Sequence, residues 1–113
     1  MNVGQIVLIL IAFLFFVFGT CWSQVEVLHF NSEWNVENNF DISTLKDCET
    51  ENIIICHNPE MQEKHSILSV PTIIIFDEGE EVKRFQANIM LQIDATRKQI
   101  QREIDEIYLK KFE

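Results

Sequence analysis

SVPTIIIFDEGEEVKRF, residues 69–85, carries the clearest structural pattern in the sequence. Its first eight residues are rich in β-formers and predict a strand, with a proline near the start, where a missing N–H costs the sheet least. The segment 77–80 predicts a hairpin turn, because Gly79 adopts a positive φ without steric cost. Residues 81–87 are then expected to return as an antiparallel strand.

Upstream of this hairpin, the sequence predicts two more strands and two helices. Residues 25–30 (VEVLHF) and 53–56 (IIIC) are apolar and β-forming, and the second is expected to be buried on both faces. A weak helical pattern covers Phe40 to Cys48. A second helix is expected over residues 59–67, since Pro59 suits the first helical position and Asn58 can cap it.

Downstream, residues 91–112 predict one long helix, whose apolar stripe consists of Ile93, Ile100, Ile104 and Ile107. The expected order is therefore β-α-β-α-β-β-α, a four-stranded mixed sheet flanked by helices in an α/β domain. Helical crossovers predict parallel neighbours among the first three strands, and the tight turn makes the last pair antiparallel.

The N-terminal part of the chain has a different character, because residues 6–18 (IVLILIAFLFFVF) are all apolar. As a helix this run rises about 20 Å, short of a ~30 Å hydrocarbon core but within the length of a signal-peptide core. Residues 1–23 are therefore either a cleaved signal peptide or an uncleaved single-pass transmembrane anchor, and residues 24–113 form the folded domain. Both alternatives place that domain outside the cytoplasm, secreted or membrane-anchored.

The charge of the domain is strongly acidic. The formal net charge is −9, and every charged side chain lies at or after Glu26. Such a surface repels phosphate backbones, so we expect no nucleic-acid partner. The acidity otherwise serves solubility.

Three stretches together resemble the thioredoxin family. SVPTIIIFDEGEEVKRF is similar to that family's Val/Ile-Pro-Thr segment with its strand, turn and return strand. IIICHNPEMQEKHSILSVPT, residues 53–72, is similar to the preceding strand, Asn-Pro and short helix. VLHFNSEWNVENN, residues 27–39, resembles the strand and site loop where Trp-Cys-x-x-Cys occurs. The resemblance covers residues 25–112 and implies a thioredoxin-like fold with a cis Val70–Pro71 bond facing the site loop.

The same resemblance indicates that the redox pair is missing. Trp34 aligns with the tryptophan before that pair, so Asn35 and Asn38 occupy the positions of the two cysteines. Dithiol exchange needs a thiolate at a helix N-terminus and a second thiol to resolve the mixed disulfide, and an amide side chain provides neither. His29 takes the place of the family's buried acid. We therefore expect a redox-inactive domain that uses no cofactor and no metal.

The expected function is binding of a protein or extended peptide in a groove beside the cis-proline. Backbone next to such a proline can pair with an extended strand, and exposed aromatic residues mark interfaces. The groove residues are expected to be Trp34, Asn35, Asn38, Val70 and Pro71. Two alternatives remain open: Pro71 only shapes a turn, and Trp34 only packs within its loop.

The cysteines support a second functional hypothesis. Cys48 and Cys56 are expected at opposite ends of one strand, beyond the ~7 Å Cα limit for a disulfide. Cys56 is the alternative catalytic residue of a thiol–disulfide oxidoreductase, although a lone cysteine is more often a small buried hydrophobe, which we favour. His57 and His65 do not complete a zinc site with Cys56, because no fourth ligand occurs at a familiar spacing. In a third alternative the apolar segment serves a membrane complex that the domain merely accompanies.

Overall fold

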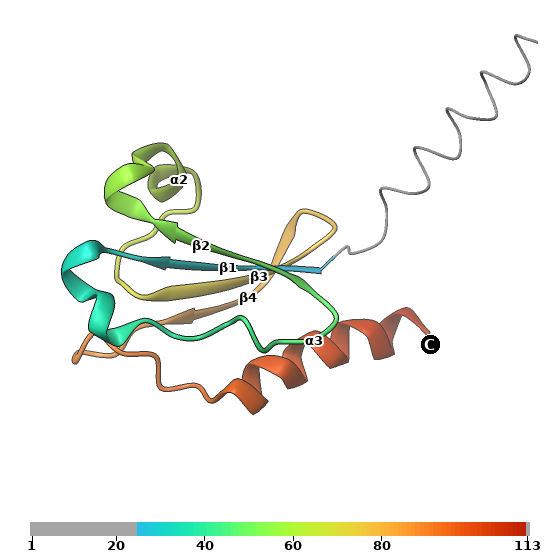
Figure 1. The fold of residues 1–113 in the computed structure, drawn as a ribbon. Helices are drawn as coiled ribbons and strands as arrows, with labels where there is room; N and C mark the ends of the chain where they lie inside the picture. Colours follow the sequence, from blue (N-terminus) through green and yellow to red (C-terminus); the bar gives the residue numbers. More distant parts are fainter. Residues whose placement is uncertain (1–24, 113) are drawn as a thin grey trace, which may run out of the picture.

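The computed structural model describes residues 25–112. A four-stranded mixed sheet with the order β2-β1-β3-β4 forms its centre (Figure 1). Its strands are β1 (Val25–Asn31), β2 (Glu49–Ile54), β3 (Thr72–Asp77) and β4 (Glu80–Gln86). The apolar run at residues 6–18 and the boundary at residue 23 lie outside the described residues. Within the described part, no helix is long and apolar enough to cross a membrane.

The helices differ in length and type from those expected. The first crossover contains only the 3-10 helix η1 (Glu33–Asn38), and a second 3-10 turn, η2 (Ile55–His57), follows β2. The α-helices are α2 (Pro59–Lys64) and α3 (Arg97–Lys111). Despite these differences, the expected α/β class and four-stranded mixed sheet are confirmed.

The helix expected over Phe40 to Cys48 is wrong. Asp41 Oδ1 accepts hydrogen bonds from the backbone N–H and the hydroxyl of Ser43, at 2.9 and 2.5 Å. Such local bonds compete with helical ones. The pattern rested on Phe40, Leu45 and Cys48, of which Leu45 is buried and the other two are half-buried against the same core, so it indicated the inward side in part and helical backbone incorrectly.

The expected parallel arrangement of the first three strands is also wrong in part. β2 is parallel to β1, but β3 is antiparallel to it, with Phe30 opposite Thr72. A six-residue helix such as α2 rises about 9 Å, whereas a six-residue strand is about 20 Å long. The chain therefore does not recross the sheet and enters β3 from the end where it left β2.

The strand at β2 was expected to be buried on both faces, but β2 is an edge strand and most of it is exposed. Its first four residues, Glu49 to Asn52, are exposed, and only Ile53 is fully buried. The strand also begins earlier than the apolar run suggested, and Ile55 and Cys56 already belong to η2. Position at the edge of the sheet explains why polar residues are tolerated in it.

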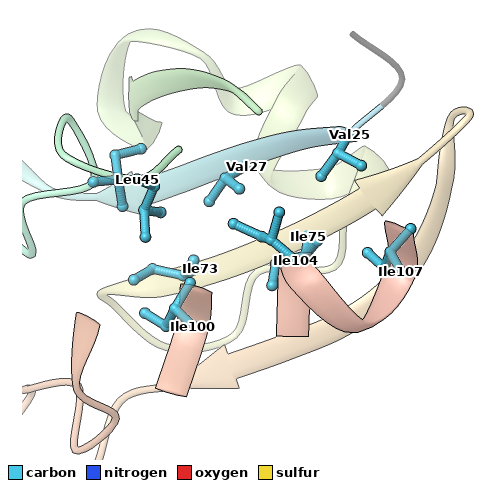
Figure 2. Packing of buried hydrophobic residues seen from close by; sticks show 9 residues of the cluster. Val25, Val27, Leu45, Ile73, Ile75, Ile100, Ile104 and Ile107 are labelled. Carbon is cyan, nitrogen blue, oxygen red and sulfur yellow. The ribbon is translucent and has the colours of Figure 1, made fainter. Parts of the chain in front are cut away.

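The face of the sheet that packs on α3, here called the α3 face, bears the larger core. The apolar stripe of α3 is confirmed, since Ile100, Ile104 and Ile107 are buried there. Figure 2 shows these isoleucines directed at strand residues, and the core cluster comprises Val25, Val27, Ile42, Leu45, Ile73, Ile75, Ile100, Ile104 and Ile107. α3 begins later than expected because Thr96 and Gln99 form a capping box, which leaves Ile93 in the preceding loop.

The opposite face, here called the α2 face, has a smaller cover. Its core cluster consists of Leu28, Phe30, Ile53, Ile67, Val70, Ile74 and Phe76. α2 ends at Lys64, short of the expected residue 67, and Asn58 does not cap it by a side-chain bond. Asn58 Nδ2 instead donates to the Ile54 carbonyl at 3.1 Å, which links α2 back to the end of β2.

Candidate functional site

The expected site residues lie at one end of the sheet. β1 ends there and continues into η1, β3 begins there after Pro71, and β4 ends there before the loop at residues 87–96. Phe30 is opposite Thr72, and Thr72 is opposite Gln86, which brings three loops together (Figure 1). The sheet register therefore assembles a site from segments far apart in sequence.

Asn35 lies at the centre of this site and is 5% exposed. Its Nδ2 group donates to the carbonyl oxygens of Val70, at 3.4 Å, and Leu91, at 3.2 Å. It also donates to Asn31 Oδ1 at 3.2 Å. One amide group thus links the loop after β1 to the loops before β3 and after β4.

The neighbouring amides extend this network. Asn38, which is half-buried, donates from Nδ2 to Asn35 Oδ1 at 2.8 Å and accepts from Gln92 Nε2 at 3.1 Å. Asn31 is fully buried and donates to the Asn35 carbonyl at 3.0 Å and to Asn39 Oδ1. Every amide here has partners, so the network holds its segments in one arrangement.

The Val70–Pro71 peptide bond is cis, as the resemblance implied. Both residues are buried. The Val70 carbonyl accepts from Asn35, whereas the Val70 N–H donates to no group within residues 25–112. A donor of this kind at the start of a strand is available to an added peptide backbone.

Trp34 does not pack within its loop, because 68% of the residue is exposed. It borders a pocket of about 230 Å³ together with Val70, Leu68 and Ile55. Leu68 is 89% exposed. The structure therefore brings Trp34, Asn35 and Val70 together, and places an apolar pocket beside them.

A second exposed apolar pair lies on the loop after β4. The Asn88 side-chain oxygen accepts from the backbone N–H groups of Met90 and Gln92, at 2.8 and 3.2 Å. These bonds fix a turn in which Ile89 is 98% exposed and Met90 is also exposed. Leu91 has a φ of 60°, a left-handed conformation that a leucine rarely adopts, and its carbonyl accepts from Asn35.

His29 is buried on the α3 face of β1 and is satisfied there. Its Nε2 accepts from the Phe40 N–H at 3.1 Å. Burial lowers the pKa of His29 below its ordinary value, and a side-chain hydrogen bond with Asn52 offsets part of that effect. A neutral ring that accepts a backbone N–H stabilises the turn into residues 40–48.

The two other histidines, His57 and His65, are engaged separately. His57 contacts the Glu33 carboxylate, which joins η2 to η1. His65 packs between Phe30 and Phe76, with ring centroids 5.5 and 5.3 Å away. In residues 25–112 no group of three His, Cys, Asp or Glu side chains is placed to hold a metal ion.

The cysteines lie on either side of β2, as expected, and neither forms a disulfide within the described chain. Cys48 is half-buried, and burial, with a smaller contribution from Asp47, raises the pKa of its thiol. Cys56 is exposed, so the favoured prediction that it is a packed core residue is wrong. It belongs to the 3-10 turn η2, which follows β2 and has no buried residue, and not to the strand.

Several residues of the site were missed by the sequence interpretation. These residues are Asn31, Asn39, Leu68, Ile89, Met90, Leu91 and Gln92. The density of asparagine between residues 31 and 39 was a usable signal for the network. No local pattern, however, indicated that the loop after β4 reaches Asn35, because that contact depends on strand register.

Comparison with known proteins finds similar structures but no similar sequence family. No protein-family model and no curated protein matches the chain. Among solved structures, thioredoxin 1 from Thermosipho africanus TCF52B is similar with a TM-score of 0.60 and 21% identity, over 78% of this chain and 99% of that chain. A mutant thioredoxin from Halobacterium salinarum NRC-1 gives a TM-score of 0.57 and 19% identity, over 74% of each chain.

A malaria-parasite thioredoxin-2, described as a component of protein secretion machinery, gives a TM-score of 0.60 at 19% identity, over 74% of this chain and 82% of that chain. At such identities the likeness concerns the fold alone.

Proposed function

We propose, on the premise that this chain has a thioredoxin-like fold, that it is a redox-inactive domain that binds an extended segment of a partner protein. The segment lies in the groove beside Val70 and Pro71, between Trp34 and the loop after β4. The bond network of Asn35 is the observation that carries this proposal, because it assigns a structural role to the position where the resemblance places a reactive sulfur.

The chemistry of the groove suits a peptide backbone with apolar side chains. The Val70 N–H offers a donor to an added strand, and the pocket of about 230 Å³ offers a place for one apolar side chain. Trp34 and Leu68 supply exposed apolar surface at its border. Aromatic anchors beside a pocket are typical of residues that dominate binding energy.

The proposal includes export of the domain. The apolar run at residues 6–18 supports either a cleaved signal peptide or a retained anchor. Mass spectrometry of the mature N-terminus distinguishes the two, since cleavage removes Cys21 if it occurs at residue 23. Deleting residues 1–23 and measuring whether the protein still reaches its partner tests the alternative that the apolar segment alone is functional.

The redox part of the proposal is tested by insulin reduction with a reducing partner. The wild-type chain is expected to give background turnover. The double variant Asn35→Cys with Asn38→Cys restores a dithiol at these positions and is expected to gain turnover. Clear wild-type activity would refute the inactive assignment, and failure of the folded double variant would refute the alignment of the two asparagines.

The binding part is tested by selection from a random-peptide library. Selected peptides are expected to lose affinity for the Trp34→Ala and Leu68→Ala variants, by about tenfold for a residue at the centre of an interface. Val82→Ala is the matched control, because Val82 is also an exposed apolar residue but lies on β4 away from the groove. Equal loss in all three variants would contradict the proposed groove.

The exposure of Cys56 supports a second candidate function, a thiol–disulfide oxidoreductase that uses this single residue. Rapid alkylation of Cys56 does not distinguish a catalytic thiol from a merely exposed one, since an exposed thiol reacts in either case. Turnover does: loss of a measurable exchange activity in Cys56→Ser, with Cys48→Ser unaffected, would favour the enzyme over the binding domain.

A further inference from the structure

The two edges of the sheet are protected to different degrees. The β3–β4 ladder has a register shift between Ile75 and Phe76, and the edge strand β4 carries Lys83 and Arg84. Both features discourage pairing with another strand. β2 pairs with β1 over six consecutive positions without a shift and contains no proline, lysine or arginine. Its outer backbone groups face no strand of residues 25–112.

The accessible part of β2 is acidic on one face. Glu49 and Glu51 alternate with Thr50 along the strand, and Glu26 of β1 is the register partner of Glu49. These three glutamates, here called the acidic edge, line a shallow pocket of about 130 Å³ with Leu28 and Thr50. None of the three forms an ion pair with a described residue. Their mutual repulsion across adjacent strands is therefore not offset by a neighbouring cation in an ion pair.

A pocket of mixed character continues from the acidic edge across the α2 face, and Lys64 and His65 also line it. This second pocket of about 240 Å³ shares Glu26, Leu28 and Glu51 with the first and extends to Met61 and Phe76. α2, which is only six residues long, borders this pocket through Met61 and Lys64, and Leu28 and Phe76 at its floor are buried. The surface lies near the start of β2, whereas the proposed groove lies where β1 ends, so the two are separate.

Charge decides which occupant fits this edge. A second copy paired through β2 would place glutamates opposite glutamates. In β4 of a second copy, Arg84 already bonds Glu81 and the carbonyls of His65 and Ser66, which leaves only Lys83 in that strand to face two glutamates. Residues 1–24 contain no lysine or arginine, so the N-terminal segment supplies no side-chain cation either.

We infer that β2 accepts an added strand from a partner protein whose segment carries lysine or arginine at alternate positions. Side chains at alternate positions of that strand lie on the α2 face, where they meet Glu49 and Glu51. The residues between them lie beside Thr50 and Asn52, which suits threonine or valine. Backbone pairing provides the affinity, and the glutamates select the basic partner and reject a second acidic copy.

The test uses the full chain in a nonionic detergent and a fluorescein-labelled probe peptide, TKTKVKT. The variant Glu49→Lys with Glu51→Lys is expected to weaken binding of the probe by about tenfold, since two attractions become repulsions. Glu63→Lys with Glu106→Lys changes the net charge equally at two other exposed positions and is expected to leave binding unchanged. Glu49→Gln with Glu51→Gln should give a smaller loss in the same direction.

Two further measurements separate strand addition from attraction between charges. Amide hydrogen exchange is expected to slow in β2 when TKTKVKT is bound. The peptide TKPKPKT keeps all three lysines but cannot complete a strand ladder, so it is expected to bind poorly. Equal binding of both peptides, equal weakening by both lysine variants, or protection located in another strand would overturn the inference.

Discussion

Asn35 donates from one amide group to carbonyl oxygens that lie 35 and 56 residues further along the chain. A residue that binds three loops together has no spare donor for chemistry, and its removal would leave the buried Val70 carbonyl and the part-buried Leu91 carbonyl without this partner. The cost of an unsatisfied buried group exceeds the net gain from an average hydrogen bond. Asn35 is therefore expected to matter for stability before it matters for any ligand.

Replacing Asn35 by alanine is expected to lower the free energy of unfolding by about 1–3 kcal/mol. Urea denaturation followed by circular dichroism measures this change. Asn58→Ala is the control, because Asn58 also donates a side-chain bond to one carbonyl but is exposed, and water replaces that bond. Equal destabilisation by the two variants would show that the buried network has no special role.

His29 makes stability depend on pH. Its pKa is lowered in the folded state, so the unfolded chain binds a proton more readily, and stability falls as the pH drops below about 6.5. His29→Gln, which does not titrate, is expected to make this acid-side slope shallower in chemical denaturation between pH 7.5 and 5.5.

A second histidine, His65, also makes stability fall as the pH drops, so part of the slope remains in His29→Gln. Burial, followed by Lys64 and Arg84, lowers the pKa of His65 as well, and Glu81 opposes that effect. His65→Gln should therefore remove a separate part of the slope, and the double variant should show the flattest profile. An unchanged slope in His29→Gln would mean that the buried ring does not titrate as its contacts indicate.

At the scale of elements, the hairpin between β3 and β4 was predictable and the first crossover was not. Glu78 and Gly79 both have positive φ, as a two-residue type I′ loop requires. A glycine in the local sequence indicates such a turn. Residues 40–48 take their path instead from α3, where Gln101 accepts from the Lys46 N–H at 2.8 Å and Arg97 donates to the Thr44 carbonyl. A pattern over nine residues contains no information about those distant partners.

Glu78→Asn is expected to raise the free energy of unfolding by about 0.5 kcal/mol, because asparagine tolerates a positive φ better than glutamate does. Thermal unfolding measures the gain. Glu80→Asn is the matched control, since Glu80 lies in β4 and has no positive φ. The prediction is wrong if both substitutions shift the melting temperature equally.

At the scale of the whole molecule, the excess of acidic charge opposes folding and the two cores support it. The α3 face is covered by a helix with three buried isoleucines, whereas the α2 face is covered only in part. Sheet order determines which strand remains at the edge and hence where the unpaired glutamates lie. The same β2 sequence in a central position would have to bury them.

Raising NaCl from about 10 to about 150 mM shortens the Debye length from roughly 30 to roughly 8 Å and is expected to raise the melting temperature. Glu49→Lys with Glu51→Lys should reduce this gain more than Glu63→Lys with Glu106→Lys, although both pairs change the net charge equally. Scanning calorimetry at the two salt concentrations measures the effect. An equal salt response in both variants would contradict a local repulsion at the acidic edge.

The sequence by itself determined the α/β class, the hairpin and the stripe of α3, because propensity, turn chemistry and periodicity act over a few residues. The roles of Trp34, Asn35 and the Val70–Pro71 pair followed only from the resemblance to the thioredoxin family. Only the tertiary structure decided the direction of β3, the exposure of Cys56, the edge position of β2 and the contact between Asn35 and Leu91. Each of these depends on which distant segments become neighbours, and sheet order and register establish that for the whole chain at once.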